Sequence, residues 1–250
     1  MSCLYDAVIP FHKKDALILP YCVAGLKQNA EGLGNIYIIS AENPEEEDCE
    51  WIPESAFPFT KEDICSYIPK PERTGWYLQQ LLKLSAFSVI KTDKPYILIF
   101  DSDCVMKKPV SFFQDGHPVF ATGLNEYYKT YFTHMNKIIP GLGRQIEDVT
   151  GITHHSLFSR EIMEELICKI EEIHGIPWWK ALLSNVSPDD YQCGMAEYEI
   201  YFNYCLAFHP TLYKLRPLKM ESVFFFDFFH MSSADIVALH EWTFYATGDT

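Results

Sequence analysis

The chain is poor in basic residues and has no long apolar run, and both features limit its partners. Only 20 of its 250 residues are Lys or Arg, against 34 Asp or Glu, so the net charge is −14. Nucleic acids and anionic membrane surfaces are bound by clustered Lys and Arg, so we expect neither as a partner. No stretch reaches the roughly 18 apolar residues of a membrane-spanning helix, and no membrane span is expected.

Several familiar motifs are also missing. The eight cysteines include no C-x-x-C pair, which argues against a zinc ribbon or a thioredoxin-like site. There is no P-loop, no G-x-S-x-G and no H-E-x-x-H, and neither G-x-G segment has the third glycine of a dinucleotide-binding fingerprint. The segment after Met1 lacks the basic start and apolar run of a secretory signal, so we expect a cytoplasmic protein with reduced thiols.

What is present is an alternation of apolar runs and amphipathic segments, which is typical of an α/β fold with a parallel sheet. We predict strands over residues 5–9, 35–40, 96–100 and 118–122. Helices are predicted over residues 15–28, 75–90, 160–173 and 197–208, with Pro20 breaking the first, Thr74 and Ser159 as N-caps, and Gly175 just past the third. Residues 42–73 show no clean period and are expected to be loops with short helical turns, and residues 125–149 are expected to be irregular. Because there is no repeat or linker, we predict a single domain over residues 1–250.

The strongest motif follows the most strand-like segment, residues 96–100, which runs directly into Asp101-Ser102-Asp103. Two carboxylates at i and i+2 would lie at the carboxyl edge of the sheet, where open α/β sheets bind ligands. Carboxylate oxygens are preferred ligands of Mg²⁺ and Mn²⁺. We therefore expect Asp101 and Asp103 to hold a divalent cation that binds a diphosphate; the alternative is that they only cap the following turn.

The order of these parts resembles a GT-A glycosyltransferase. In particular, it resembles small glycosyltransferase-like families that share three more motifs, here GWYLQQLLK at 75–83, HHSLF at 154–158 and EYE at 197–199. The resemblance covers nearly the whole chain. It implies a Rossmann-like, mostly parallel central sheet flanked by helices, with a nucleotide-sugar-binding half at 1–105 and an acceptor and catalytic half at 106–250. It also implies transfer of a sugar from a UDP- or GDP-sugar to a hydroxyl of a glycan or another acceptor, assisted by Mn²⁺ or Mg²⁺.

The resemblance also implies roles for individual residues. The base and ribose would lie near Pro10, Phe11 and Ser40. Asp101 would lie near the ribose or a water on the metal, and Asp103 would bind the metal directly. A late histidine, His240 or else His230, could be a third metal ligand, although a structural role is the alternative for both.

Further polar residues could face the same site. Gln79 and Lys83 lie one turn apart on the expected helix and could point at the diphosphate or the sugar, or simply form a solvated face. His154 and His155 are adjacent on an expected strand, so at most one of them faces the site. That one could contact the donor or the acceptor; the alternative is a packed core histidine.

Glu197 and Glu199 are candidates for the base that an inverting transfer requires. On a helix the two lie about 200° apart, so only one can face the site, and the sequence does not separate them. The alternative is that both are carboxylates favoured by the helix dipole. Without a base at this position, a retaining route is possible.

Two other functions compete with glycosyl transfer. A sugar nucleotidyltransferase would also use a sheet, carboxylates and a metal, but commonly has a Gly-rich basic loop near its N-terminus, whereas residues 9–17 read IPFHKKDAL. A catalytically silent nucleotide-sugar-binding module is the second alternative, and the intact D-S-D and E-Y-E motifs count against it.

Overall fold

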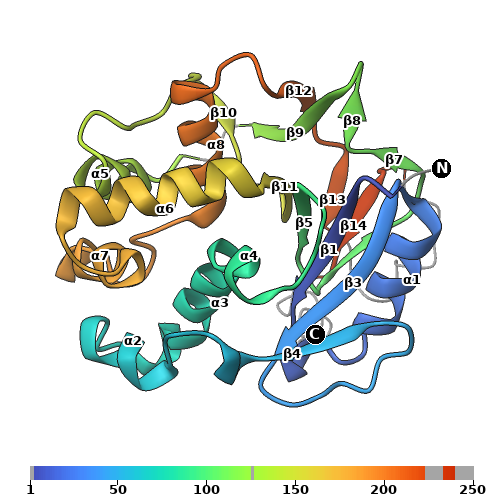
Figure 1. Cartoon of the computed structure of the whole chain (residues 1–250), viewed down its shortest axis with the longest axis horizontal. Helices are drawn as coiled ribbons and strands as arrows, with labels where there is room; N and C mark the ends of the chain where they lie inside the picture. Colours follow the sequence, from blue (N-terminus) through green and yellow to red (C-terminus); the bar gives the residue numbers. More distant parts are fainter. Residues whose placement is uncertain (1–2, 125–126, 223–232, 240–250) are drawn as a thin grey trace, which may run out of the picture.

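The computed structural model describes residues 3–124, 127–222 and 233–239, and its main sheet has five strands (Figure 1). Their order across the sheet is β11–β5–β1–β3–β4. The four strands from β5 to β4 are parallel to one another, and β11 runs antiparallel to β5. The bounds are β1 Tyr5–Pro10, β3 Leu33–Ser40, β4 Glu50–Pro53, β5 Tyr96–Phe100 and β11 His155–Ser159. The predicted α/β fold with a mostly parallel sheet is confirmed.

Apolar side chains from successive residues of the central strands enter two separate cores. Val8 of β1 packs into a core shared with α3, α6, α7 and α8, whereas its neighbours Ala7 and Ile9 pack into a core shared with α1. This is the alternation that a strand imposes on its side chains. Because both faces of β1 are covered, the strand is apolar at nearly every position rather than alternating in polarity.

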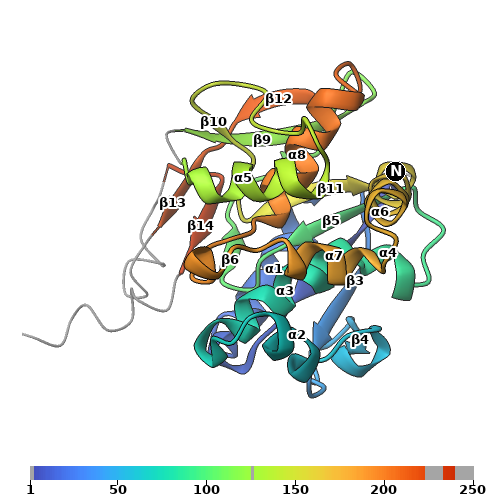
Figure 2. The same cartoon turned by 90° about the vertical axis from the view of Figure 1, so that its left-hand side faces the viewer.

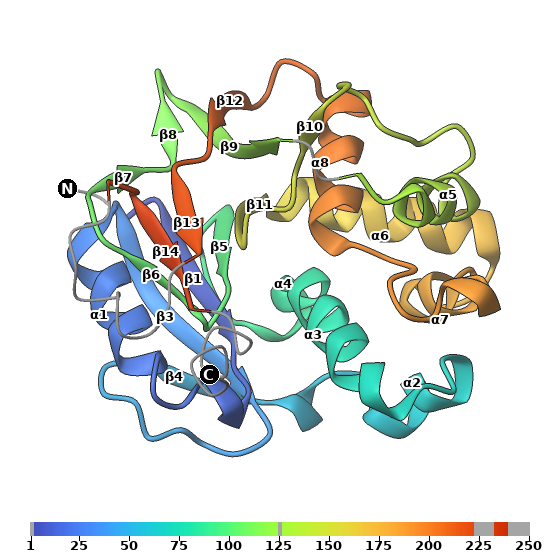
Figure 3. The same cartoon turned by 180° about the vertical axis from the view of Figure 1, so that it is seen from behind.

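The helices lie on both sides of the sheet, as Figures 1 and 3 show. The helix α1 lies on one side, and most of the others gather on the opposite side. The bounds are α1 Leu19–Asn29, α2 Lys61–Tyr67, α3 Thr74–Leu84, α4 Ala86–Val89, α5 Lys129–Ile138, α6 Arg160–His174, α7 Trp178–Ser184 and α8 Glu197–Phe208.

Short strands form three smaller sheets around the main one. Figure 2 shows β9, β10 and β12 together above β11 and β5, and β13 and β14 beside them. In the first group β9 pairs with β10, β12 and β8; in the second β14 pairs with β6 and β13; and β2 pairs with β7. The bounds are β2 Ala30–Glu31, β6 Cys104–Met106, β7 Val110–Ser111, β8 Phe113–Gln114, β9 His117–Leu124, β10 Val149–Thr150, β12 Lys214–Pro217, β13 Met220–Ser222 and β14 Ile236–Ala238.

Two predicted helices have different bounds in the structure. The first begins at Leu19 rather than residue 15, because Pro20 is favoured in the first turn of a helix and disfavoured inside it. The second divides at Ser85 into α3 and α4, and Thr74 is its first helical residue rather than its N-cap. By contrast, α8 has the predicted bounds, and α6 ends before Gly175, whose φ of 65° is the left-handed conformation of a helix C-cap.

Of the two segments without a clean period, residues 42–73 contain the expected short helical turns and also a strand. They include α2, which begins with a capping box between Thr60 and Asp63, and β4 at the edge of the main sheet. Residues 125–149, expected to be irregular, include α5. The strand and α5 were missed because each occupies only a small part of its segment.

Three other sequence expectations concern the chain as a whole. All eight cysteines are free, and among the described residues no helix is long and apolar enough to cross a membrane. The strand β11 from residues 106–250 joins the sheet beside β5 from residues 1–105, so the two proposed halves share one sheet.

Candidate functional site

A cavity of about 270 Å³ lies at the carboxyl ends of β1 and β5. Six segments converge on it: the segment after β1, one face of α3, the D-S-D motif after β5, α5, the segment before β11, and the start of α8. Its lining residues are Lys14, Asp15, Trp76, Gln79, Gln80, Lys83, Asp101, Ser102, Asp103, Tyr131, Ile152, His154, Ala196, Glu197 and Tyr198. The structure therefore brings most of the sequence-predicted polar residues together at the sheet edge where α/β proteins bind ligands.

Asp101 is the buried centre of a side-chain network in this cavity. Its Oδ1 is 2.6 Å from the Lys83 ammonium and accepts a hydrogen bond from the Tyr198 hydroxyl at 3.0 Å. Its Oδ2 is 3.1 Å from Nδ1 of His154, and its backbone N–H donates to the His154 carbonyl at 2.9 Å. Both carboxylate oxygens therefore have protein partners, so this geometry makes Asp101 an anchor for neighbouring side chains.

Lys83 lies between two carboxylates. Its ammonium is 2.6 Å from Asp101 and 2.7 Å from Oε1 of Glu197, and it lies 4.3 Å from the centre of the Tyr198 ring. Burial alone would lower the pKa of Lys83, but the two carboxylates outweigh it and raise the pKa above its usual range. Burial would likewise raise the pKa of Asp101, but Lys83 and His154 hold it below its usual range. Lys83 and Asp101 are therefore both charged at neutral pH.

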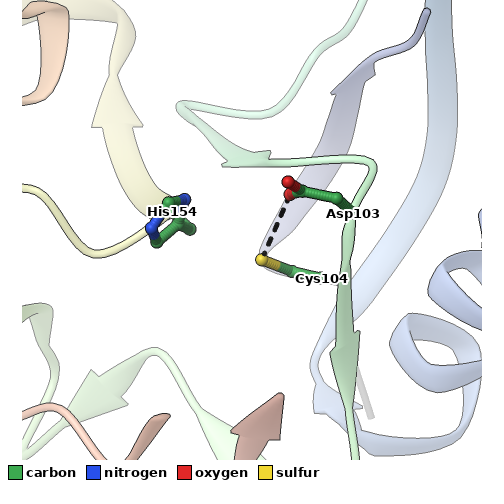
Figure 4. Close-up of side chains that lie close together, drawn as sticks. All are labelled: Asp103, Cys104 and His154. Carbon is green, nitrogen blue, oxygen red and sulfur yellow. Dashed lines mark hydrogen bonds between the residues drawn. The ribbon is translucent and has the colours of Figure 1, made fainter. Parts of the chain in front are cut away.

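Three side chains are close enough to one another to hold a metal ion. Ligand atoms of Asp103, Cys104 and His154 all lie within 4.8 Å of each other, and Figure 4 shows His154 across an opening from the other two. His154 has a φ of 57°, in the left-handed region that non-glycine residues rarely adopt, and such strain tends to occur at functional sites.

The chemistry of Asp103 and His154 fits a divalent cation. A neutral His154 that donates from Nδ1 to Asp101 carries its lone pair on Nε2, which is the arrangement of most metal-binding histidines. Cys104 differs, because it is buried and its Sγ donates to Oδ1 of Asp103 at 3.6 Å. Burial raises the pKa of the Cys104 thiol well above its usual value, so this thiol is protonated. A carboxylate with an imidazole is thus the set that this site offers to Mn²⁺ or Mg²⁺.

Ser102 joins the motif to the segment after β1. Its hydroxyl donates to Oδ2 of Asp15 at 2.7 Å, and Oδ1 of Asp15 is 3.6 Å from the Lys14 ammonium. Burial raises the pKa of the Asp15 carboxyl. The sequence interpretation did not single out Lys14 and Asp15. The signal was available, because β1 and β5 are adjacent parallel strands and residues soon after each of them meet at one edge.

Glu197 and Glu199 have different surroundings, as expected from their angular separation on a helix. Glu197 lines the cavity and contacts Lys83. Glu199 does not line it; its carboxylate accepts hydrogen bonds from Thr150, Asn203 and the Gly151 backbone at 2.5, 2.7 and 3.3 Å. Of the two candidate bases, Glu197 is therefore the one that can reach a ligand in this cavity.

His155 is also placed away from the cavity. It is buried in the core next to the rings of Phe100 and Phe112, and its Nδ1 is 2.7 Å from the Thr153 carbonyl. Burial lowers its pKa to about 4. The adjacent histidines thus have different positions, with only His154 at the cavity.

The residues expected to hold the base and ribose do not line this cavity. Ser40 is buried, donates to the Glu42 carbonyl at 2.7 Å and accepts from the Trp51 indole at 3.1 Å. Pro10 is buried at the end of β1, and Phe11 is half-buried against the α1 core. Their assignment to the nucleotide stays a prediction. His230 and His240 lie outside the described residues.

Comparisons with known proteins place the chain in a family. Residues 35–245 match the model of a family of unknown function, DUF6492. The chain belongs to this family. A search of curated proteins finds no match.

Among solved structures, this DUF6492 member is similar to mouse xyloside xylosyltransferase 1 in its apo form. The match has a TM-score of 0.51 at 12% sequence identity, and it covers 96% of this chain and 98% of that chain. At this identity the similarity concerns the fold, so the chain has a glycosyltransferase-like fold.

The cavity of this DUF6492 member has an excess of negative charge. Four carboxylates and two ammonium groups line it, from Asp15, Asp101, Asp103, Glu197, Lys14 and Lys83. A bare diphosphate would meet net repulsion here, whereas a diphosphate with a divalent cation would not.

Proposed function

We propose that this chain is a glycosyltransferase that moves a sugar from a UDP- or GDP-sugar to a hydroxyl of a glycan or another acceptor. The proposal rests above all on the acidic cavity at the carboxyl ends of β1 and β5, which holds the D-S-D motif, Lys83, His154 and Glu197 together. The glycosyltransferase-like fold supports it.

In this proposal, Asp103 and His154 bind Mn²⁺ or Mg²⁺. A divalent cation there would supply positive charge that neutralises the departing nucleoside diphosphate. Asp101 orients His154 through Nδ1 and is itself held by Lys83 and Tyr198. Asp101 thus supports the metal site rather than binding the metal, which differs from the expectation that Asp101 and Asp103 both hold the cation.

The transfer breaks the bond between C1 of the sugar and the diphosphate oxygen, and its electron pair leaves with the diphosphate. The acceptor oxygen forms the new bond to C1. In an inverting route the acceptor proton passes to the Glu197 carboxylate, which lines the cavity and contacts Lys83. A retaining route would need no base at Glu197.

The test is a thermal-shift screen of UDP-, GDP-, CMP- and TDP-sugars, each with and without Mn²⁺. A donor at 100 times its Kd stabilises a protein by about 2.7 kcal/mol, so the correct donor will raise the Tm in the presence of Mn²⁺. Binding with no transfer or hydrolysis would indicate the binding-module alternative.

Asp103→Asn provides the matched test of the metal site. We expect it to remove the Mn²⁺ dependence of donor binding while the protein stays folded. Asp93→Asn is the control, because Asp93 is exposed and precedes β5, at the opposite end of the strand from the motif. The proposal fails if no nucleotide sugar raises the Tm, or if Asp103→Asn binds donor with unchanged Mn²⁺ dependence.

A further inference from the structure

One buried polar group in the cavity lacks a partner. The Gln80 side chain is 2% exposed and lines the cavity, and its Nε2 has no hydrogen-bond partner among the residues that the structure describes. An unpaired buried donor is destabilising, so native proteins contain few of them. In a ligand cavity, such a donor points to a group on the ligand.

The orientation of this amide is fixed by the start of α8. The Glu197 backbone N–H donates to Oε1 of Gln80 at 3.0 Å. A backbone N–H can only donate, so the amide oxygen must face it, and Nε2 must take the other position. The unpaired atom of Gln80 is therefore a donor, and its ligand partner must be an acceptor.

The surroundings of Gln80 favour a hydroxyl over a phosphate as that acceptor. Gln80 binds the backbone of Glu197, whose carboxylate lines the same cavity and would repel a phosphate oxygen. A hydroxyl can accept from Nε2 and donate to a carboxylate.

The rest of the cavity suits a single sugar ring. Trp76 and Tyr131 also line it, and together with a few polar groups they resemble the mixed lining of small-molecule sites. The volume of about 270 Å³ is just below the range of roughly 300–1,000 Å³ for drug-sized ligands. This volume is enough for one sugar ring.

We infer that Gln80 determines specificity by donating a hydrogen bond from Nε2 to one hydroxyl of a sugar ring in this cavity. This inference rests on the proposed glycosyl transfer and identifies the ligand group that the cavity recognises. The hydroxyl can belong to the transferred sugar or to a sugar acceptor, and donor binding and acceptor kinetics distinguish these two sources.

The position of Gln80 on α3 supports this role. Trp76, Gln79, Gln80 and Lys83 all line the cavity and lie at i, i+3, i+4 and i+7, which is one face of a helix. Lys83 on this face contacts Asp101, the first residue of the D-S-D motif. A ring bound by Gln80 would therefore lie one helical turn from the D-S-D network.

The experiment uses Gln80→Met in the full chain, which keeps the side-chain volume and removes the amide donor. Three ligands are titrated with Mn²⁺: the bare nucleoside diphosphate, the donor that the screen identifies, and the deoxy analogues of that donor. Deoxy analogues of the acceptor are compared by KM. Gln80→Met also removes the acceptor for the Glu197 N–H. Any resulting change in affinity should be the same for all the sugars, whereas the loss of a hydroxyl contact changes affinity only for sugars that carry that hydroxyl.

We expect the wild type to bind one deoxy analogue about tenfold more weakly than its parent sugar, as a lost hydrogen bond predicts. Gln80→Met should remove this difference and bind the bare diphosphate as the wild type does. If the analogue with the weaker binding is a deoxy donor, the hydroxyl belongs to the transferred sugar. If that analogue is a deoxy acceptor, the hydroxyl belongs to the acceptor.

The inference is overturned, while the proposed function stands, if the wild type and Gln80→Met discriminate equally between each deoxy analogue and its parent sugar. If the wild type binds no nucleotide sugar at all, both are overturned. Should Gln80→Met fail to fold, Gln80→Leu also removes the donor without adding charge, and must give the same loss of discrimination.

Discussion

Two carboxylates in the first turn of α8 have opposite surroundings. Glu199 is enclosed by groups that satisfy it, with hydrogen bonds from Thr150, Asn203 and the Gly151 backbone. Glu197 lines a cavity, shares Lys83 with Asp101, and lies beside Gln80, whose amide nitrogen is unpaired among the described residues.

The difference separates a structural network from a binding network. A buried polar network whose members are all paired rigidifies the fold and leaves nothing for a ligand. A network that opens onto a cavity and contains an unpaired donor is incomplete until a ligand binds. Variants on each side of this comparison should therefore change different measurements.

The largest expected effect on stability is that of Lys83→Met. Removing the buried ammonium leaves Asp101 and Glu197 without their shared partner, and breaking a buried ion pair in this way costs about 3–5 kcal/mol. The measurement is the free energy of unfolding in urea. Lys94→Met is the control, because the Lys94 pair with Asp93 is at the surface and should contribute little. Equal losses in the two variants would show that Lys83 does not hold the network together.

Glu197→Gln should affect catalysis most clearly. If Glu197 is the general base, sugar transfer should fall by about 100-fold or more, while Mn²⁺-dependent donor binding should remain, because Asp103 and His154 are unchanged. The readouts are kcat for transfer and the Kd of the donor. Transfer at the wild-type rate would exclude Glu197 as the base and favour a retaining route.

Much of the fold could be predicted from the sequence where one local signal dominated. The strand at 96–100 is apolar on both faces, and α6 combines a strong apolar face with Gly175 at its end, so both were predicted correctly. The helix α5 was missed, because it occupies only ten residues of a long segment and buries only Tyr131, His134, Met135 and Ile138. The edge strand β4 has no fully buried residue, so its sequence carries little of the apolar signal.

The site could be predicted only in part, for a reason that Asp101 illustrates. Its place after β5 is a local property, so its position at the sheet edge was predicted from the sequence. Its partners Lys83, His154 and Tyr198 come from three other segments, and no local pattern pairs them. Gln79 was chosen over Gln80 for the same reason, since the sequence does not show that Glu197 fixes the Gln80 amide.

Glu199→Gln should change stability rather than catalysis. The substitution replaces one acceptor oxygen by an NH₂ group, which must face donors from Thr150, Gly151 or Asn203. We expect the free energy of unfolding to fall by about 1–3 kcal/mol. The kcat of the folded variant should equal that of the wild type. A variant with wild-type stability and greatly reduced kcat would reverse the assignment of the two glutamates.

His134 provides a contrast with Gln80, because it is a buried polar side chain that does not line the cavity. It is 2% exposed; its Nε2 is 2.8 Å from the Leu182 carbonyl, and its Nδ1 has no partner among the described residues. Burial lowers its pKa from 6.5 to about 4. Unlike the unpaired donor of Gln80, this unpaired nitrogen should affect the stability of the protein and no ligand.

The pH dependence of unfolding tests this role of His134. Above pH 6.5 the ring is neutral in both the folded and unfolded states. As the pH falls towards 4, the unfolded state binds the proton first, so the free energy of unfolding decreases, by roughly 2 kcal/mol at pH 5. His134→Gln keeps a donor for the Leu182 carbonyl but cannot titrate, so its unfolding free energy should fall less than that of the wild type between pH 7 and pH 5. His155, whose pKa is also lowered to about 4, will keep part of the slope in the variant. An identical pH dependence in the two proteins would show that the pKa of His134 is the same in the folded and unfolded states, contrary to the effect of burial expected here.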